Sequence, residues 1–185
     1  MARMPPLSVD ALSEDQRRVY DAIAAGPRGV VRGPLAVWLQ SHGLAARAQE
    51  LGAYCRYGSS LPPGLSELAI VVTAAYWRSG YEWSVHAPIA LRSGVSEAAL
   101  EAIRTRQAPV FDDPQQGVVH AFATELMNSR CVCDATWERA HALLGMQALV
   151  DLVGVLGYYG LISMTINAFE IPPDGDDPFA DAARA

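Results

Sequence analysis

The 185-residue sequence contains no lysine, so all 14 of its basic side chains are arginine. An ε-ammonium group is needed for Schiff-base chemistry, for anchoring pyridoxal phosphate and for a phosphate-binding P-loop. The sequence therefore excludes these three chemistries. Its 20 acidic residues give a net charge of -6. Because nucleic acid requires a basic surface, we do not expect it as a partner.

Charge of either sign is scarce. Charged residues make up 18% of the chain, below the roughly 25% of an average soluble domain, while 51% of the residues are hydrophobic. So few charged side chains would leave apolar surface exposed on a monomer. We therefore expect a homo-oligomer in which part of that surface is buried between subunits.

Cysteine is also sparse. Cys55, Cys131 and Cys133 include no C-x-x-C pair, which favours reduced thiols in a cytoplasmic protein. No further Cys or His follows Cys131 and Cys133 at zinc-finger spacing, so we expect no metal site. The N-terminus lacks the features of a signal peptide. Residues 152–169 are uncharged but carry three glycines and several polar groups, which favours a buried helix over a membrane span.

Helical periodicity interrupted by Gly and Pro runs along the chain, and strand patterns are nearly absent, so we predict an all-α fold. Ser13 and Gln16 form a capping-box pattern for a first helix that ends at Gly26. We expect residues 1–171 to form a single domain and the acidic tail, 172–185, to be flexible. The other expected helices cover residues 35–39, 44–57, 65–77, 81–92, 96–104, 115–128, 134–144 (with Asp134 as N-cap) and 147–169.

The helical hairpin expected at residues 65–92 carries the candidate catalytic side chains. Glu82 and His86 are four residues apart, so they share one helix face and can hydrogen-bond. A carboxylate beside an imidazole is a usable proton relay near neutral pH. Glu67 lies on a strongly apolar arm and must reach an exposed edge or pair with a buried partner, for which we nominate His86.

Aromatic and arginine residues near this pair are candidates for binding a substrate. Four aromatic side chains could wall a small pocket, and a bidentate guanidinium suits a carboxylate. Glu–His pairs also occur on solvated helix faces, and aromatic residues at helical spacing also fill cores. The convergence of all these residues on one hairpin favours a site. The predicted substrate-binding residues are Tyr76, Trp77, Tyr81, Trp83, Arg78 and Arg32.

The stretch SELAIVVTAAYWRSGYEWSVHAPIALRSGVS, residues 66–96, resembles the signature hairpin of the carboxymuconolactone decarboxylase family. That family also contains the AhpD-like disulfide reductases, whose pattern is a glutamate, then C-x-x-C, then a histidine four residues beyond the second cysteine. Glu67 and His86 match the glutamate and the histidine of this pattern. Ser79 and Glu82 stand at the two cysteine positions.

The missing C-x-x-C separates this chain from the redox branch, because disulfide exchange depends on a thiolate pair. The family resemblance covers about residues 33 to 167, and the form Y-E-W-x-x-H at Tyr81 to His86 instead resembles the decarboxylase-like branch. That resemblance implies an all-α AhpD-like bundle around a central hairpin, assembled as a trimer or hexamer without metal or organic cofactor. It also implies an enzyme of aromatic catabolism that releases carbon dioxide from a small acidic or lactone substrate.

In this hypothesis His86 moves a proton onto or off a carbon next to a carbonyl group, while Glu82 and Glu67 hold and tune the ring. Two other interpretations remain open. The first is a non-catalytic, small-molecule-binding oligomer on the same scaffold. The second is a thiol-dependent peroxide or disulfide reductase that recruits Cys131 and Cys133.

Overall fold

The computed structural model describes residues 3–5 and 8–180, and within these residues it contains helices and no strand. The all-α prediction is therefore confirmed. Short turns at η1 (Val9–Ala11) and η2 (Leu39–Ser41) and a π-helical turn at η3 (Tyr54–Gly58) lie between the α-helices. The α-helices are α1 (Glu14–Ala25), α2 (Pro34–Trp38), α3 (His42–Ala53), α4 (Pro63–Trp77), α5 (Gly80–Arg92), α6 (Glu97–Arg104), α7 (Pro114–Ser129) and α8 (Asp134–Phe169).

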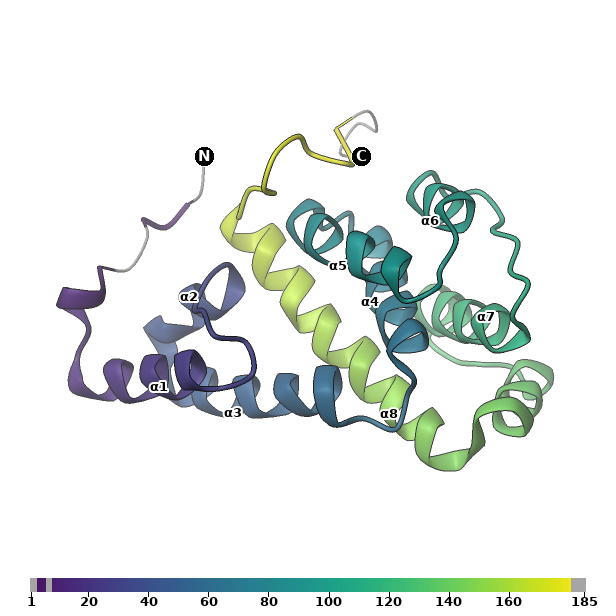
Figure 1. Ribbon diagram of the computed structural model, residues 1–185, viewed down its shortest axis with the longest axis horizontal. Helices are drawn as coiled ribbons and strands as arrows, with labels where there is room; N and C mark the ends of the chain where they lie inside the picture. Colours follow the sequence, from purple (N-terminus) through teal and green to yellow (C-terminus); the bar gives the residue numbers. More distant parts are fainter. Residues whose placement is uncertain (1–2, 6–7, 181–185) are drawn as a thin grey trace.

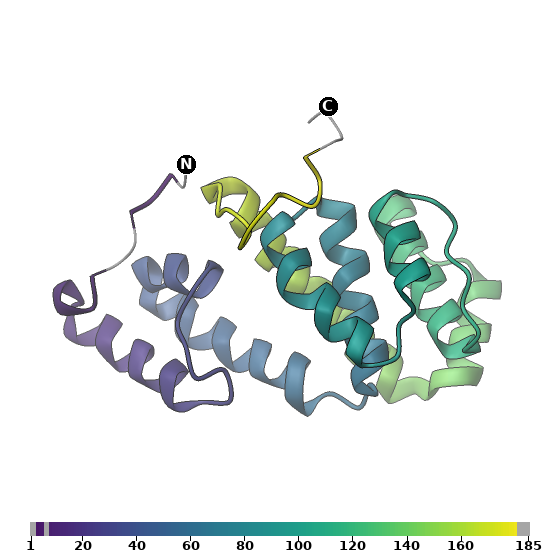
Figure 2. The same cartoon turned by 45° about the horizontal axis from the view of Figure 1, so that its top comes forward.

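The long helix α8 runs through the middle of the molecule and divides the other helices into two groups (Figure 1). Helices α1, α2 and α3 lie on one side of α8, and α4 to α7 lie on the other, as the turned view also shows (Figure 2). Leu152, Val155 and Tyr159 of α8 are buried between the groups. Side chains from both groups can therefore meet around the middle of α8.

Two local signals in the sequence account for where helices begin and break. The Ser13 hydroxyl accepts from the backbone N–H of Gln16, and the Ser13 N–H donates to Oε1 of Gln16, which confirms the predicted capping box. Gly145, at φ 79° and ψ 167°, breaks α8 where two separate helices were predicted. The prediction of Asp134 as an N-cap is wrong by one residue, because Cys133 has the extended cap conformation and Asp134 begins the helix.

Helix α4 is buried on nearly all its faces, as expected for a helix whose residues from Leu65 to Ala75 are almost all apolar. It ends at Arg78, which adopts the left-handed conformation at φ 51° and lets the chain turn into α5. The predicted hairpin is therefore present as α4 and α5. Its single carboxylate in the buried stretch, Glu67, has to find a partner inside the protein.

The apolar part of α8 is long enough to cross a bilayer, but 61% of that stretch is buried inside the protein. Its buried side chains include Leu152 and Ile162, which belong to the core that α4 shares. This degree of burial is typical of a core helix.

The C-terminal segment returns to the hairpin after α8. The Arg78 guanidinium donates to the Phe179 carbonyl oxygen at 2.6 Å, and the Arg104 guanidinium donates to the Pro178 carbonyl oxygen at 2.7 Å. The buried Phe179 ring meets Trp83 edge-on at 5.5 Å. The flexibility expected for the tail stays a prediction, and its residues 181–185 lie outside the described part of the chain.

Candidate active site

The three predicted catalytic residues form one buried chain of hydrogen bonds. His86 Nδ1 lies 2.6 Å from Oε2 of Glu67 on α4, and His86 Nε2 lies 2.9 Å from Oε1 of Glu82 on α5. All three side chains are less than a tenth exposed. The contact between Glu82 and His86 follows from their spacing of four residues on α5. The contact between Glu67 and His86 follows from the packing of α4 against α5. We call this set, Glu67, His86 and Glu82, the relay.

The relay favours a charged imidazole. Burial works against the charged ring, but the carboxylates of Glu82 and Glu67 outweigh it and raise the pKa of His86 above its ordinary value. A ring protonated on both nitrogens can donate to both carboxylates at once. A proton can therefore pass between the ring and either neighbour.

A cavity of about 410 Å³ opens beside the relay, and Glu82 and the His86 ring line it. Its walls come from the loop after α1, from η3, from α5 and from α8, so both helix groups contribute. Arginine is its most frequent lining residue, and we call it the arginine cavity. Its other lining residues are Arg28, Val30, Arg32, Pro34, Leu35, Arg56, Tyr57, Tyr81, Ser84, Val85, Ile89, Arg92, Tyr159, Ile162 and Asp174.

The electrostatic character of the arginine cavity is set by four guanidinium groups. Arg28, Arg32, Arg56 and Arg92 line it, against the carboxylates of Glu82 and Asp174. Arg32 also pairs with Asp174 at 3.6 Å. Guanidinium groups are suited to binding carboxylates through two parallel hydrogen bonds. The cavity is therefore chemically suited to a small anion next to Glu82.

Glycine is required at two positions around the arginine cavity. A Cβ atom at Gly52 would overlap the Tyr158 hydroxyl and the Arg28 guanidinium, which approach the backbone of α3 at this point. A Cβ atom at Gly33, which has φ 57°, would lie 2.6 Å from the Tyr81 ring. Both glycines let a cavity-lining side chain pack directly against backbone.

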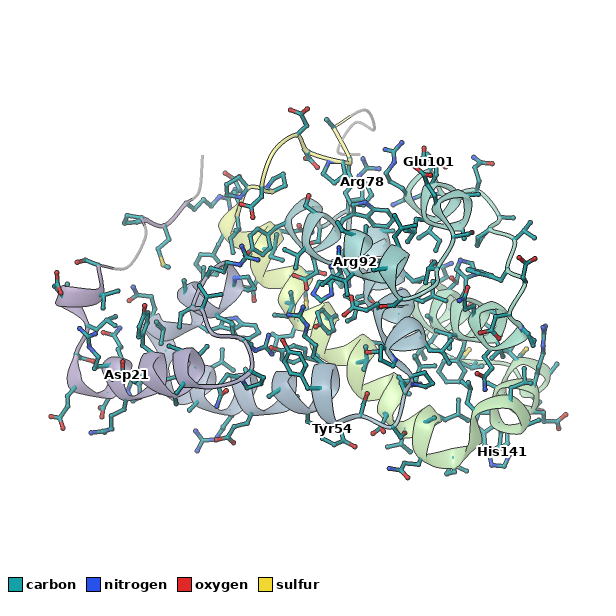
Figure 3. All side chains as sticks on the ribbon, viewed as in Figure 1. Asp21, Tyr54, Arg78, Arg92, Glu101 and His141 are labelled. Atoms are coloured by element: carbon teal, nitrogen blue, oxygen red, sulfur yellow. The ribbon has the colours of Figure 1, made fainter. Side chains whose placement is uncertain are left out.

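The helix period decides which residues of the predicted hairpin reach the arginine cavity. Glu82, Val85, Ile89 and Arg92 recur on α5 at intervals of three and four residues, and with His86 they line its wall. Figure 3 shows Arg92 beside α5 near the centre of the molecule. Of the predicted substrate-binding residues, Tyr81 and Arg32 line the cavity as well.

The other four predicted substrate-binding residues, Tyr76, Trp77, Trp83 and Arg78, are not among those that line the arginine cavity. The Tyr76 hydroxyl donates to the Met127 carbonyl oxygen, and its ring is 41% exposed. Trp77 stacks edge-on against Tyr76. Trp83 comes one residue after Glu82 and therefore faces another side of α5. Arg78 binds the C-terminal segment, beside which Figure 3 places it.

Sequence reasoning missed several cavity residues, and those on α5 had a local signal. Arg92 continues the face of α5 that begins with Glu82, so the helix period could have found it. Arg28 and Arg56 come from irregular or π-helical segments whose direction depends on packing against α8. Tyr159 lies on a helix that is apolar on most faces, so its position gave no signal.

The cysteines are not part of the arginine cavity. Cys55 is buried beside α8, while Cys131 and Cys133 are exposed free thiols at the connection between α7 and α8. Among the described residues, no group of three His, Cys, Asp or Glu side chains is arranged to hold a metal ion. His120 lies at a second cavity, and His141 on α8 stacks on Trp137.

The fold and the site together define an all-α protein with a carboxylate–imidazole–carboxylate relay at the edge of an arginine-lined cavity. Residues 43–125, which span α3 to most of α7 and include the relay, match the model of the Carboxymuconolactone decarboxylase family. This segment of the chain is thus similar to that family, as the resemblance of the hairpin sequence led us to expect.

Solved structures share this fold along nearly the whole chain. A peroxidase-related protein from Ralstonia eutropha JMP134, described as an alkylhydroperoxidase AhpD core, has a TM-score of 0.74 at 18% identity and covers 96% of this chain and 94% of its own. A peroxidase-related protein from Silicibacter sp. TM1040 has a TM-score of 0.73 at 17% identity with the same coverage. The debrominase Bmp8 has a TM-score of 0.69 at 17% identity and covers 94% of this chain and 92% of its own. No curated protein sequence matches significantly.

Proposed function

We propose that the protein is a carboxy-lyase-type enzyme that removes carbon dioxide from a small carboxylated or lactone substrate, using its own side chains as acid and base. The observation that carries this proposal is the position of Glu82, which joins the buried relay to the arginine cavity. Arginines in the cavity would bind the acid groups of the substrate. The relay would supply and remove the proton.

The sequence suggested that His86 exchanges the proton with the substrate while Glu82 and Glu67 hold the ring. The geometry of the relay favours a different assignment. Both ring nitrogens of His86 are occupied by carboxylates, so neither is free to contact a substrate. Glu82 is the carboxyl group at the cavity wall, whereas Glu67 is not among the lining residues. In our proposal Glu82 exchanges the proton with the substrate, His86 exchanges it with Glu82, and Glu67 orients the ring.

The proposed reaction balances without an external oxidant or reductant. The bond between the substrate carbon and its carboxylate breaks, and carbon dioxide leaves. The electron pair of that bond moves through the conjugated system to the carbonyl oxygen and forms a dienolate. Glu82 takes a proton from the charged His86 ring and gives it to carbon, the carbonyl re-forms, and the ring then recovers a proton from water.

The test is turnover of a panel of carboxylated lactones, followed by carbon dioxide release. Glu82→Gln and His86→Gln should each lower kcat/KM by roughly 10²- to 10⁴-fold, the usual range for loss of a general acid or base. His120→Gln, at the second cavity, is the matched control and should stay within about threefold of wild type. Full activity of Glu82→Gln would contradict the proposal. Binding without any turnover would indicate a non-catalytic binding protein.

A thiol-dependent reductase is the second candidate, favoured by the exposed thiols of Cys131 and Cys133 and by the peroxidase-related proteins that share the fold. Against it, the positions of the family C-x-x-C carry Ser79 and Glu82. A variant in which Cys55, Cys131 and Cys133 are replaced by serine separates the two candidates. Peroxide reduction that disappears in this variant would favour the reductase, and retained carbon dioxide release would favour the lyase.

Cytoplasmic location and homo-oligomer formation, as a trimer or hexamer, belong to the same proposal. The exposed side of α8 carries large apolar side chains that water would otherwise contact, among them Met146, Val150, Val153 and Met164. Gly157 on this side has no heavy atom within 4 Å of where a Cβ atom would lie. Sedimentation of the wild type and of Val150→Glu would test whether this face joins subunits.

A further inference from the structure

Tyr159 is a buried phenol beside the relay that the mechanism above does not use. It lies on α8, is 2% exposed and lines the arginine cavity. Its ring meets the His86 ring edge-on, with 5.2 Å between the centroids and 80° between the planes. No other tyrosine that lines the arginine cavity has a described ring contact with His86. The Tyr159 ring is thus held against the relay at the wall of the cavity.

The hydroxyl of Tyr159 is available to a bound molecule. No hydrogen bond to it is found among the described residues, although the neighbouring Tyr158 hydroxyl accepts one from Arg28 at 3.3 Å. The hydroxyl is not one of the fully enclosed polar atoms that lack a partner, so it can be reached from the cavity, where a ligand could take the place of water as its partner. The phenol stays neutral, because burial and the carboxylates of Glu82 and Glu67 raise the pKa of Tyr159 well above its ordinary value. It is therefore a hydrogen-bond donor at all physiological pH values.

We propose that Tyr159 is a further catalytic residue, which donates a hydrogen bond to the carbonyl oxygen of the substrate while Glu82 acts on its carbon. This inference rests on the proposed function. When the carbon–carbon bond breaks, its electron pair moves to that oxygen, and the Tyr159 O–H stabilises the negative charge without giving up its proton. The proton that the carbon gains comes from Glu82, so each group has one task.

The kinetic test is Tyr159→Phe, which removes one oxygen atom and leaves the ring contact with His86. Loss of one oxyanion donor typically lowers kcat by about 10²- to 10³-fold, and we expect a loss in this range with KM within about threefold. Tyr76→Phe, whose hydroxyl lies at the second cavity, is the matched control and should keep wild-type kcat. A Tyr159→Phe variant with wild-type kcat would overturn the inference while leaving the roles of Glu82 and His86 intact.

A second test needs no turnover and uses 4-hydroxy-3-nitrobenzoate as the probe. Its carboxylate suits the arginines, and its phenolate, which absorbs in the visible range, imitates the charged oxygen of the dienolate. Wild type should bind the probe and shift its ionisation towards phenolate. Tyr159→Phe should bind it through the arginines with the shift reduced.

The outcomes of this second test separate the inference from the proposed function. An equal shift in Tyr159→Phe overturns the role of Tyr159, whereas the anion-binding role of the cavity stands. If neither the wild type nor the variants Arg56→Gln and Arg92→Gln bind the probe, the anion-binding role of the cavity is contradicted. The inference about Tyr159 is then contradicted as well.

Discussion

Two of the cavities in the described part of the molecule are nearly equal in size, about 410 and 420 Å³, and each is lined by a histidine. His86 in the arginine cavity lies between two carboxylates, and its pKa is raised. The second cavity lies between α4, α6 and α7 and is lined largely by apolar groups such as Val72, Ile103 and Met127. There, burial alone acts on His120 and lowers its pKa.

A histidine at a cavity can transfer protons near neutral pH only when its neighbours stabilise the charged ring. His120 has only a long contact to the Thr124 hydroxyl, at 3.5 Å, and a ring contact with Phe111. A neutral imidazole in apolar surroundings can neither hold a proton at neutral pH nor pass it to a carboxylate. The groups around a histidine are therefore more informative about proton transfer than the size of the cavity beside it.

The largest expected effect is on stability, and it separates the two histidines directly. His86→Leu would leave Glu67 and Glu82 facing each other inside the protein without a cation. Removing one partner of a buried ion pair typically costs about 3–5 kcal/mol in the free energy of unfolding. His120→Leu removes a neutral ring with one weak contact and should cost less than about 1.5 kcal/mol.

Urea denaturation at pH 7 measures both differences, and two-state unfolding should hold in each variant for the comparison to be made. Equal losses of stability in His86→Leu and His120→Leu would show that the carboxylates do not distinguish the two sites. The stability of each site would then not depend on whether its histidine is charged.

A smaller effect concerns the direction in which pH changes stability. The folded-state pKa of His86 is raised, so its contribution is fully present below the unfolded value of about 6.5 and is lost as the pH rises through the folded pKa. The folded-state pKa of His120 is lowered by burial, so its contribution is present above that value and is lost as the pH falls.

Unfolding free energies of wild type, His86→Gln and His120→Gln between pH 5 and 9 therefore should diverge in opposite directions. The gap between wild type and His86→Gln should shrink towards alkaline pH, and the gap for His120→Gln should shrink towards acid pH. Imidazole NMR of the wild type provides an independent reading of the same two charges. A shared direction for both gaps would contradict the electrostatic distinction.

The helices and the relay could be predicted from sequence because each depends on local spacing. The capping box at Ser13, the break at Gly145 and the i, i+4 pair of Glu82 and His86 all act within a few residues of the chain. The pairing of Glu67 with His86 depends on a contact between two helices, but the apolar residues around Glu67 already required a buried partner for its carboxylate. These features follow from periodicity and from the cost of burying an unpaired charge.

The cavity wall could not be predicted, because it depends on how distant segments pack. Arg28 and Arg56 reach the cavity from segments without regular periodicity, and Tyr159 reaches it because α8 passes between two groups of helices. The aromatic residues of the hairpin share its sequence neighbourhood, yet Tyr76 and Trp83 face other sides of α4 and α5. Their closeness in sequence to Glu82 and His86 suggested that they line the same cavity, whereas the side of the helix on which each residue lies determines this.

The smallest expected effect concerns Asp174, a carboxylate at the arginine cavity that would compete with a bound anion for Arg32. It pairs with Arg32 at 3.6 Å, and its side chain is 73% exposed. Exposed pairs contribute little, so Asp174→Asn should lower the Kd for 4-hydroxy-3-nitrobenzoate by only about twofold to threefold. The gain should vanish at 1 M salt because the charges are screened. Asp176→Asn removes the same charge outside the cavity, and an equal gain there would mean that net charge, and not competition for Arg32, sets the affinity.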